Sequence, residues 1–449
     1  MSEVVGKRIQ GLHKRGTLLL TEQPFAYILA GKLHDKRCAY CFASSELRKC
    51  SGCSYAHYCD RDCQKKGWYF HKEECANIKR LEPQVIPDAV RMLARLIIKL
   101  QKGGAHERSF YTHSKFRVFK DLMSHYNEIK NDIKKMEHFM CLHEALQAYL
   151  GADNLPNSAE LLGIYGRMVI NSFSIFDDSG HTIGTGLYLA ASVVDHSCNP
   201  NAVTVFDGTT LYIRTLEDME NINWPNIYIS YIDNLDLPSK RQKELERVYY
   251  FLCQCQKCKD VEELKAMTSV ICQNKGCDGI LSLEPMNMLQ TCTKCNNGLS
   301  DEKLKEIEEV ISFTEEQLES MKDVAYLDIC RMCLRKQQGL LYYTNIYNVK
   351  VLQTAMDSCI LMKNWEGALE YGTMAKEVWR KYSGNYNPYY GIAVLKLGKI
   401  AQYINRLEDS QKFLKEAADI LLVTHGEKHP LVKNELLELL KYNEAYMNA

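Results

Sequence analysis

The chain has 449 residues, of which 46% are hydrophobic and 25% are charged, a composition that fits two or three compact domains and excludes a disordered tail or a miniprotein. Its 56 Lys and Arg residues balance its 56 Asp and Glu residues, so the net charge disfavours a protein that binds nucleic acid or an anionic membrane through its overall field. Because the sequence has no hydrophobic signal core and no apolar run of about 18 residues, we expect a soluble intracellular protein, present in both cytoplasm and nucleus.

A cysteine-rich segment at residues 38–75 is the first predicted element. The chain has 19 cysteines, and in a reducing compartment short-spaced cysteine pairs favour metal sites over disulfides. Tetrahedral zinc takes four thiolate or imidazole ligands, so eight ligands in this segment predict two closed sites. We expect the Cys-x2-Cys pairs on tight turns and each pair at i, i+4 spacing on one helix face. We also expect the fold of this segment to depend on the metal. The ligands pair as Cys38 with Cys41, Cys50 with Cys53, Cys59 with Cys63, and His71 with Cys75.

A helical region followed by a sheet is predicted next. Between residues 76 and 150 apolar residues recur at helical spacing up to the turn signal Gly103-Gly104. Asn157 and Glu160 form an N-cap and N3 pair that is typical of a helix start. From residue 171 to 233 the pattern becomes short, β-rich and turn-punctuated, with a hairpin signal at Asp207-Gly208. The helical positions before the turn are Val90, Leu93, Leu96, Ile97 and Leu100.

Two further cysteine groups follow. Cys253, Cys255 and Cys258 are three ligands without a fourth nearby, and Cys198 in the segment DHSCNPN is the candidate to complete a tetrahedral site. A third group has knuckle spacing and glycines typical of a zinc ribbon, although unliganded loop cysteines are the alternative. Its members are Cys272, Cys277, Cys292 and Cys295. The remaining cysteines lie in helical patterns and are expected to be small buried side chains: Cys141, Cys330, Cys333 and Cys359.

Beyond residue 300 the pattern is almost entirely helical. The segments NWEGALEYGTMAKEV and RLEDSQKFLKEAADI align at a spacing of 42 residues, so that Ala375 matches Ala417 and Trp365 matches Leu407. Small residues at matching positions allow two helices to cross closely, as in helical-hairpin repeats. The repeat predicts tetratricopeptide-like (TPR-like) packing, with an ordinary helical bundle as the alternative.

These motifs in this order resemble a known family. The spacing at residues 38–75 resembles the MYND zinc finger, and DHSCNPN followed by ISYID and the cysteine trio is similar to the SET fold of protein-lysine methyltransferases with its post-SET zinc. Together they match the SET- and MYND-domain (SMYD) family over nearly the whole chain. The finger's cross-braced arrangement implies that Cys38, Cys41, Cys59 and Cys63 hold one ion and that Cys50, Cys53, His71 and Cys75 hold the other.

The resemblance implies an α+β multidomain fold. A β-rich SET domain would carry the inserted finger and a helical insert, followed by a post-SET zinc site and a C-terminal TPR-like domain. The expected boundaries are 1–37 for an apparently shortened amino-terminal SET segment, 38–75 for the finger, 76–160 for the helical insert, 161–234 for the core SET domain, 235–260 for the post-SET segment, 265–299 for the possible zinc ribbon and 300–449 for the helical domain.

The implied activity is methyl transfer from S-adenosylmethionine to a lysine side chain of a histone or non-histone protein. By resemblance Tyr231 is the catalytic tyrosine, and Tyr249 and Phe251 line the lysine channel. A buried core tyrosine, or a core histidine with satisfied hydrogen bonds, is the structural alternative at these motifs. The residues implied in cofactor binding are Asn171, Ser192, Val193, Val194, Asp195, His196, Tyr231 and Phe251.

Three departures from the family pattern concern activity. The Gly-x-Gly element near the start is absent, and Gly11-Leu12 is its candidate remnant. Asp195 replaces an asparagine, so a group that can donate hydrogen bonds becomes one that only accepts them when ionised. Trp224 and Pro225 indicate a rebuilt turn before the catalytic tyrosine, although Ile227, Ile229 and Tyr231 keep strand alternation.

The departures leave a non-catalytic adaptor as the alternative to the enzyme. Expected partners are a lysine-containing protein and, through the finger, proline-rich peptides, while nucleic-acid binding is expected to be weak or indirect and the chain monomeric. A sequence-specific DNA-binding protein is disfavoured, because the fingers lack recognition-helix spacing. The finger also carries a candidate basic face for acidic partners: Arg48, Lys49, Lys65, Lys66 and Lys72.

Overall fold

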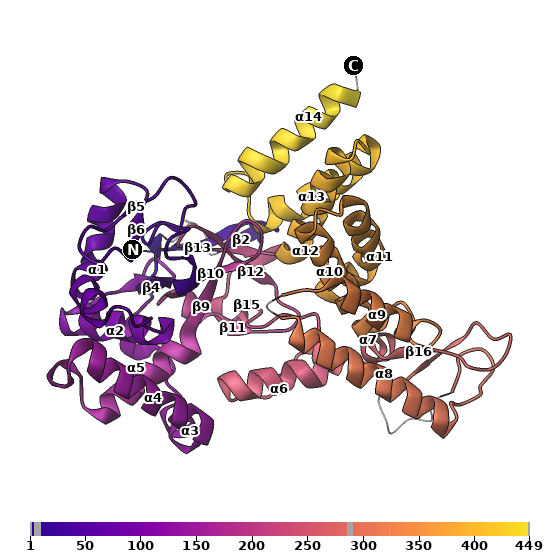
Figure 1. Cartoon of the computed structure of the whole chain (residues 1–449), viewed down its shortest axis with the longest axis horizontal. Coiled ribbons are helices and arrows are strands. Elements are labelled where there is room, and N and C mark those ends of the chain that lie inside the picture. The colour runs from indigo at the N-terminus through magenta and orange to yellow at the C-terminus, as the bar shows by residue number, and fades with distance from the viewer. Residues whose placement is uncertain (1, 4–9, 285–290, 323, 448–449) are drawn as a thin grey trace. The chain divides into compact units, whose positions relative to one another are not determined.

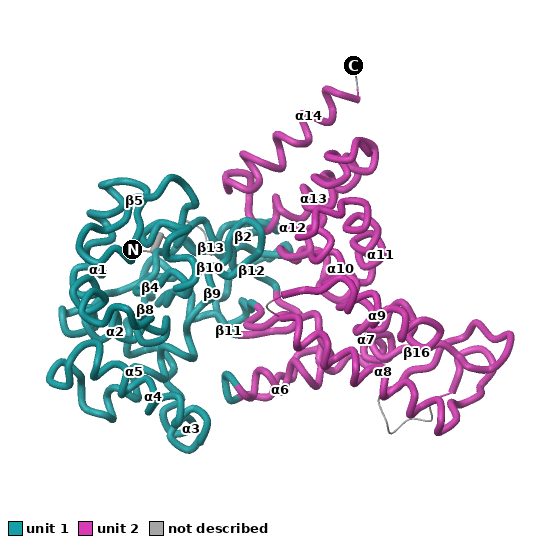
Figure 2. Tube along the Cα trace, viewed as in Figure 1, with its two compact units in different colours: residues 1–195, 201–229, 248–250 teal, residues 196–200, 230–247, 251–449 magenta. Residues whose placement is uncertain are grey.

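The computed structural model describes residues 2–3, 10–284, 291–322 and 324–447 (Figure 1). Two compact units make up the chain, and the chain passes between them after residues 195, 200, 229, 247 and 250 (Figure 2). Unit 1 comprises residues 1–195, 201–229 and 248–250; unit 2 comprises residues 196–200, 230–247 and 251–449. The segment 4–9, which precedes the glycine remnant, lies outside the described residues.

Unit 1 contains the main antiparallel sheets. The four-stranded sheet has the order β1 (Ser2–Glu3), β3 (Leu18–Glu22), β13 (Thr210–Thr215) and β12 (Ala202–Asp207). The three-stranded sheet has the order β4 (Ala26–Leu29), β10 (Thr182–Leu187) and β9 (Ser172–Phe176). The predicted hairpin is confirmed: Asp207 pairs with Thr210, and Gly208 between them has φ +56°, a conformation that glycine adopts without strain.

The helices of unit 1 are α1 (Arg61–Leu81), α2 (Asp88–Gln101), α3 (Tyr126–Asn131), α4 (Ile133–Leu150) and α5 (Ser158–Asn171). They pack on the three-stranded sheet through α2, which contacts β4, and α5, which contacts β9, while the others pack against helices. The helical pattern before Gly103 is confirmed, because α2 buries that face and packs on β4. The predicted cap is confirmed as well: the Asn157 side chain accepts a hydrogen bond from Glu160 N at 3.0 Å. Burial of this apolar stripe is what holds the helical region to the sheet.

Short strands complete unit 1. They are β2 (Gln10–His13) with β14 (Met219–Asn221), β5 (Arg48–Lys49) with β6 (His57–Tyr58), β7 (Ser109–Phe110) with β8 (Phe116–Arg117), and β15 (Tyr228–Ile229); β11 (Asp195–His196) begins in this unit. The rebuilt turn is a 3-10 helix, η6 (Trp224–Asn226), whose Trp224 is buried with its ring 5.6 Å from that of Tyr111. Strand alternation stops earlier than predicted, since β15 ends at Ile229 and Tyr231 lies beyond it.

Unit 2 is mainly helical. It contains α7 (Val261–Met267), β16 (Ser269–Ile271), β17 (Ile280–Ser282), α8 (Asp301–Ser320), α9 (Leu327–Gln337), α10 (Ile346–Leu361), α11 (Trp365–Ser383), α12 (Pro388–Tyr403), α13 (Leu407–Thr424) and α14 (Leu437–Met447), with most of α6 (Pro238–Tyr249) before them. The two segments that align in sequence are α11 and α13. Ala375 and Ala417 are both buried, and α12 lies against both helices.

A glycine shows how closely these helices pack. A Cβ atom at Gly398 of α12 would lie 2.7 Å from Leu414 Cδ2 of α13, which is too close for any larger side chain without a shift. Short connections between successive packed helices are typical of antiparallel hairpins. The predicted TPR-like packing of the C-terminal region is therefore confirmed.

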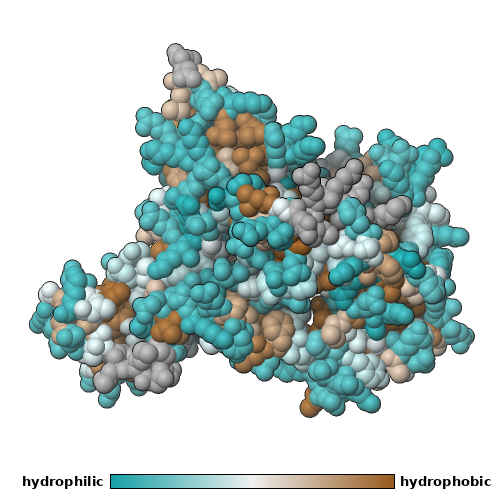
Figure 3. All heavy atoms as spheres, turned by 180° about the vertical axis from the view of Figure 1, so that it is seen from behind, coloured by the Kyte–Doolittle hydropathy of each residue, from teal (hydrophilic) through white to brown (hydrophobic). Residues whose placement is uncertain are grey.

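The surface is mixed in polarity. On the face shown in Figure 3, hydrophilic residues predominate and hydrophobic residues form several small patches. Among the described helices, none has the length and apolarity that crossing a membrane requires.

Candidate active site and metal centres

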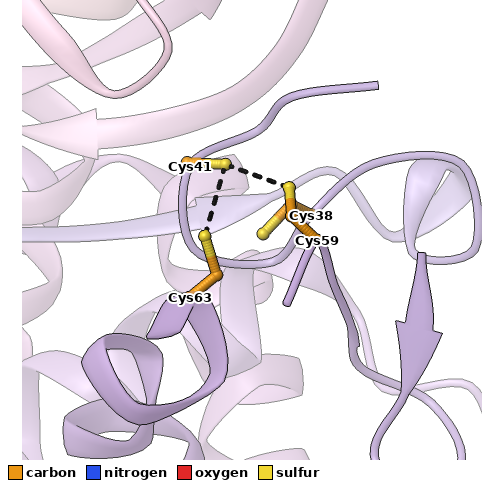
Figure 4. Close-up of side chains that lie close together, drawn as sticks. All are labelled: Cys38, Cys41, Cys59 and Cys63. Carbon is orange, nitrogen blue, oxygen red and sulfur yellow. Dashed lines mark hydrogen bonds between the residues drawn. The ribbon is translucent and has the colours of Figure 1, made fainter. Parts of the chain in front are cut away.

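The first metal centre of the finger is formed by Cys38, Cys41, Cys59 and Cys63, whose sulfurs point toward one another (Figure 4). Cys41 Sγ lies 3.5 Å from Cys59 Sγ and 3.8 Å from Cys63 Sγ. The Cys38 knuckle is a tight turn, in which Phe42 N donates to Cys38 O at 3.0 Å and Phe42 has φ +66°. Four sulfurs within 4.8 Å of one another fit tetrahedral zinc.

One local prediction for this centre is wrong. Cys59 does not share a helix face with Cys63, because α1 begins only at Arg61. Asp60 is the N-cap, and its side chain accepts a hydrogen bond from Cys63 N at 2.8 Å. A good cap at Asp60 starts the helix after Cys59 and leaves that ligand on the loop that follows β6.

The second finger centre combines Cys50, Cys53, His71 and Cys75. His71 Nε2 lies 3.3 Å from Cys50 Sγ and 3.5 Å from Cys53 Sγ. Burial lowers the pKa of His71 to about 4, so its imidazole is neutral and able to bind a metal at neutral pH. Both predicted ligand sets of the finger are thus brought together.

A buried ion pair that the sequence did not reveal ties the finger to the sheet. Glu74, one residue before Cys75 on α1, accepts bonds from Arg95 of α2 at 2.9 and 2.6 Å. Arg95 also donates to Tyr27 O of β4 at 2.5 Å. Burial would raise the pKa of Glu74, but the charges of Arg95 and Arg91 lower it to about 2, so the pair stays ionised. Removing one partner would leave an uncompensated buried charge.

The third cluster brings the predicted fourth ligand, Cys198, together with the cysteine trio. Cys198 Sγ lies 3.9 Å from Cys253 Sγ and 3.5 Å from Cys258 Sγ, and Cys255 completes the set within 4.8 Å. The hydrogen bond with Cys198 and the charge of Arg241 outweigh burial and lower the pKa of the Cys258 thiol to about 5. The buried Arg241, which no sequence pattern indicated, therefore favours the thiolate form that binds zinc.

The predicted ribbon cysteines also converge. Cys272 Sγ lies 3.6 Å from Cys295 Sγ, and Cys277 Sγ lies 3.6 Å from Cys292 Sγ. The four sulfurs all lie within 4.8 Å of one another, which favours a zinc ribbon over unliganded loop cysteines.

The remaining four cysteines differ in their burial. Cys330, Cys333 and Cys359 are buried in α9 and α10, as predicted. The prediction for Cys141 is wrong, because this residue is exposed on α4. The helical pattern around Cys141 correctly predicted a helix, but it did not show that Cys141 lies on the solvent-exposed face of α4.

The predicted catalytic tyrosine lies in unit 2 beside the third centre. Tyr231 N donates to His196 Nδ1 at 3.0 Å, and the rings of His196 and Tyr231 have centroids 5.3 Å apart. The ring of Phe251 is 5.9 Å from that of His196. The structure therefore groups Tyr231, His196 and Phe251 around one imidazole.

His196 connects this group to the metal ligands. Burial, aided by the charge of Arg241, lowers the pKa of His196 to about 4, so the ring is neutral. Because Nδ1 accepts from Tyr231 N, Nε2 carries the proton and faces Cys198 Sγ at 3.3 Å. Both ring nitrogens have partners within the protein, which favours the structural alternative for this side chain. Contact between His196 and a cofactor stays a prediction.

The other predicted cofactor residues lie in unit 1. Ser192 and Val193 belong to the 3-10 helix η5 (Ala191–Val193), Val194 is buried, and the Asp195 side chain is exposed. Ser192 Oγ donates to Tyr188 O at 2.6 Å. The structure thus keeps these residues on one short loop.

Asn171 and Tyr249 lie on helix ends. Asn171 is the last residue of α5, and its Nδ2 donates to Met123 O at 2.8 Å and to Arg167 O at 2.9 Å. Tyr249 is the last residue of α6, and the next residue, Tyr250, has φ +61°. A cofactor or substrate role for either residue stays a prediction.

Comparisons with known proteins agree with the motifs. Residues 38–75 match the MYND finger family. The chain is 32% identical to "Histone-lysine N-methyltransferase SMYD3" of Homo sapiens over 444 residues, which cover 97% of this chain and 94% of that protein. It is 27% identical to "N-lysine methyltransferase SMYD2" of Homo sapiens, covering 93% of this chain and 91% of that protein. It is 26% identical to "Histone-lysine N-methyltransferase ASHR1" of Arabidopsis thaliana, covering 93% and 89%. The chain therefore belongs to the SET- and MYND-domain (SMYD) family of protein-lysine methyltransferases.

Proposed function

We propose that this chain is an active protein-lysine N-methyltransferase that takes its methyl group from S-adenosylmethionine and transfers it to a histone or non-histone protein. The observation that carries the proposal is the group of Tyr231, His196 and Phe251 beside four cysteine ligands. The names of the relatives support the reaction class. We further propose that the chain acts as a monomer in cytoplasm and nucleus.

The residues suit this chemistry. In the proposed reaction the lysine nitrogen, after losing one proton to water, would form a bond to the methyl carbon while the carbon–sulfur bond broke and S-adenosylhomocysteine left. The bound methyl donor supplies a methyl carbon activated by its positive sulfur. The rings of Tyr231 and Phe251 favour a cation near their faces, and the Tyr231 phenol oxygen can orient the lysine amine. The exposed carboxylate of Asp195 can accept a hydrogen bond from the adenine amine or attract the sulfonium.

Zinc is proposed at all four clusters. At the third centre, zinc would fix Cys253, two residues after Phe251, and Cys198, two residues after His196. The metal would thus hold the ends of the segments that carry the aromatic group, as supporting residues do in other sites.

The test is binding followed by turnover. In the zinc-loaded chain, calorimetric titration should show micromolar binding of S-adenosylmethionine and S-adenosylhomocysteine, and radiolabelled methyl transfer to histones or a lysine peptide library should follow. The Tyr231→Phe variant should lower turnover about a hundredfold, because the phenol oxygen that orients the amine is lost, with little change in S-adenosylhomocysteine binding.

The matched control is Tyr403→Phe, since that side chain is 74% exposed and should give wild-type turnover. Wild-type turnover in Tyr231→Phe would remove this residue from the mechanism. No binding of either ligand at millimolar concentration, with zinc and folding confirmed, would reject the enzyme.

A second candidate function is partner binding through the finger. It is favoured by Trp68 and Tyr69, two exposed aromatic residues on α1, which are flanked by the exposed Lys65, Lys66 and Lys72. Aromatic anchors suit a proline-rich segment and the lysines suit acidic neighbours. A Trp68→Ala variant should lose binding to a proline-rich peptide array while keeping methyl transfer. An unchanged array pattern would argue against docking on this face.

A further inference from the structure

Glu22 is a buried carboxylate with three hydrogen-bond donors. It ends β3 and is 1% exposed. Its Oε1 accepts from Ala190 N at 2.9 Å and from Ser109 Oγ at 2.5 Å, and its Oε2 accepts from Ala191 N at 2.8 Å. Burial raises the pKa of this carboxyl, and the three hydrogen bonds oppose the rise. A carboxylate at this depth is tolerated only because its oxygens are satisfied.

The two backbone donors begin the loop that carries predicted cofactor residues. Ala190 and Ala191 are fully buried; Ala190 is the N-cap residue of η5 and Ala191 is its first residue. The side chain of Glu22 thus caps the start of this 3-10 helix, as an N-cap residue would. Ser192 follows at once, and Val194 and Asp195 lie just beyond the helix.

Arg117 also contacts the same loop. Its Nη1 donates to Ser192 O, and its Nη2 donates to Asp121 O. Arg117 on β8 pairs directly with Ser109 on β7, so one hairpin supplies both the hydroxyl to Glu22 and the guanidinium to the loop. All of these groups belong to unit 1.

We propose that Glu22, Ser109 and Arg117 are positioning residues that fix the loop 190–195 and thereby set the affinity of the chain for its methyl donor. The inference rests on the proposed function, because it needs the loop to contact the donor. The three residues act through the loop backbone and need not touch the donor themselves. Binding energy is used well only when the contacting groups are already in place.

The chemistry of the pocket dictates the variants. Glu22→Gln keeps the size of the side chain but turns its amide NH2 toward the backbone N–H of Ala190 or Ala191, which can only donate, so at least one hydrogen bond is lost. Arg117→Met keeps much of the length and removes both carbonyl contacts. Ser109→Ala removes one of the three donors to Glu22. The matched control is Arg80→Met, since Arg80 Nη2 donates to Ala148 O at 2.9 Å and to Tyr149 O at 3.0 Å elsewhere in unit 1.

The experiment is calorimetric titration of S-adenosylhomocysteine into the full zinc-loaded chain, with zinc content and thermal stability measured on each sample. Glu22→Gln and Arg117→Met should each weaken binding about tenfold, and Ser109→Ala about threefold, while Arg80→Met binds as the wild type does. In turnover assays the KM for the methyl donor should rise, with the KM for the lysine peptide unchanged. A merely structural role would lower thermal stability without changing the dissociation constant of the folded protein.

The outcomes separate the two proposals. A wild-type chain that binds S-adenosylhomocysteine, with variants that bind it equally well, overturns the positioning role alone. A folded wild-type chain that does not bind overturns the proposed function and the inference with it. If Glu22→Gln fails to fold, Arg117→Met still tests the inference, because Arg117 is only half-buried.

Discussion

Single residues after the second cysteine shape the metal knuckles. Phe42, Ser54 and Asn296 each follow a Cys-x2-Cys pair and have φ values of +66°, +55° and +56°. In each knuckle this geometry, unusual for residues other than glycine, lets the chain turn back within a few residues. In the ribbon, Lys294 N lies 3.4 Å from Cys292 Sγ, so the backbone also donates toward the ligand. These backbone angles and N–H groups orient the ligand sulfurs toward one another.

The same substitution at two centres should have different effects. Cys292→Ser should lower the zinc content from four ions per chain to three and leave S-adenosylhomocysteine binding intact, because the ribbon does not include a predicted cofactor residue. Cys198→Ser should also remove one ion but abolish binding, because His196 Nε2 faces Cys198 and His196 Nδ1 accepts from Tyr231 N. Elemental analysis and calorimetry on the same samples make this measurement.

Each of the two cysteine variants controls the other. If Cys198→Ser retains full binding after losing its zinc, the third centre does not support the aromatic group. If the wild-type chain carries three ions, the ribbon sulfurs converge without metal.

Asp195 offers a direct test of a departure from the family pattern. Asp195→Asn restores an amide donor at an exposed side chain, so stability should change by less than about 0.5 kcal/mol. S-adenosylhomocysteine should bind several-fold more tightly if the loop contacts the adenine through a donated hydrogen bond. The comparison is Asp35→Asn, an exposed aspartate outside the loop. Weaker binding in Asp195→Asn would show instead that the carboxylate is the required group.

At the scale of elements, one carboxylate joins three helices of the C-terminal region. Glu416 of α13 accepts from Lys376 Nζ of α11 at 2.8 Å and from Tyr390 Oη of α12 at 2.5 Å. Burial would raise the pKa of Glu416, but these hydrogen bonds and the charges of Lys376 and Arg380 lower it below its usual value. A lowered folded-state pKa stabilises the fold above the unfolded pKa, and that stability is lost as the pH falls through the folded pKa.

Glu416→Gln should therefore destabilise the chain by about 1–2 kcal/mol at pH 7, and the difference from wild type should shrink below about pH 4. Thermal unfolding from pH 3 to pH 8 measures it. Glu435→Gln removes the more exposed pair with Lys399 and should cost about 0.5 kcal/mol or less. A gap that does not depend on pH would assign the effect of Glu416 to packing rather than charge.

The spacing of apolar residues predicted which helices and strands form more accurately than it predicted the residues at which they begin and end. The spacing of Leu93 and Ile97 indicated α2, because residues three or four apart in one stretch of sequence lie on the same helix face. The ligand spacing of Cys59 and Cys63 predicted a helix that includes both, but the helix begins at Arg61 because the Asp60 side chain caps it. The strand toward Tyr231 ended early where the Ser230 hydroxyl donates to Ile232 O at 2.8 Å, since such local bonds compete with a ladder.

At the scale of the whole molecule, short ligand spacing indicated most of the four metal clusters, whereas Cys198 lies 55 residues before Cys253 and was added because the trio lacked a fourth ligand. The partners of Glu22 could not be predicted in this way. Ala190 lies 168 residues away and Ser109 lies 87 residues away, so only the paired strands bring them together. The same holds for Arg241 beside Cys258 and for Arg95 beside Glu74. Each arginine is brought to its partner by the tertiary fold, and no local sequence motif indicates the contact.

The pairing of β3 with β13, in which Leu20 lies opposite Ile213, has a consequence for the order of events during synthesis. When residue 75 leaves the ribosome, the finger has all eight of its ligands, but β3 must wait for a strand nearly two hundred residues later. The nascent chain can thus take up zinc and form the finger while the sheet around it is still incomplete. A shortage of zinc during translation would then first prevent the finger from folding, at a stage when the rest of unit 1 has not yet been synthesised.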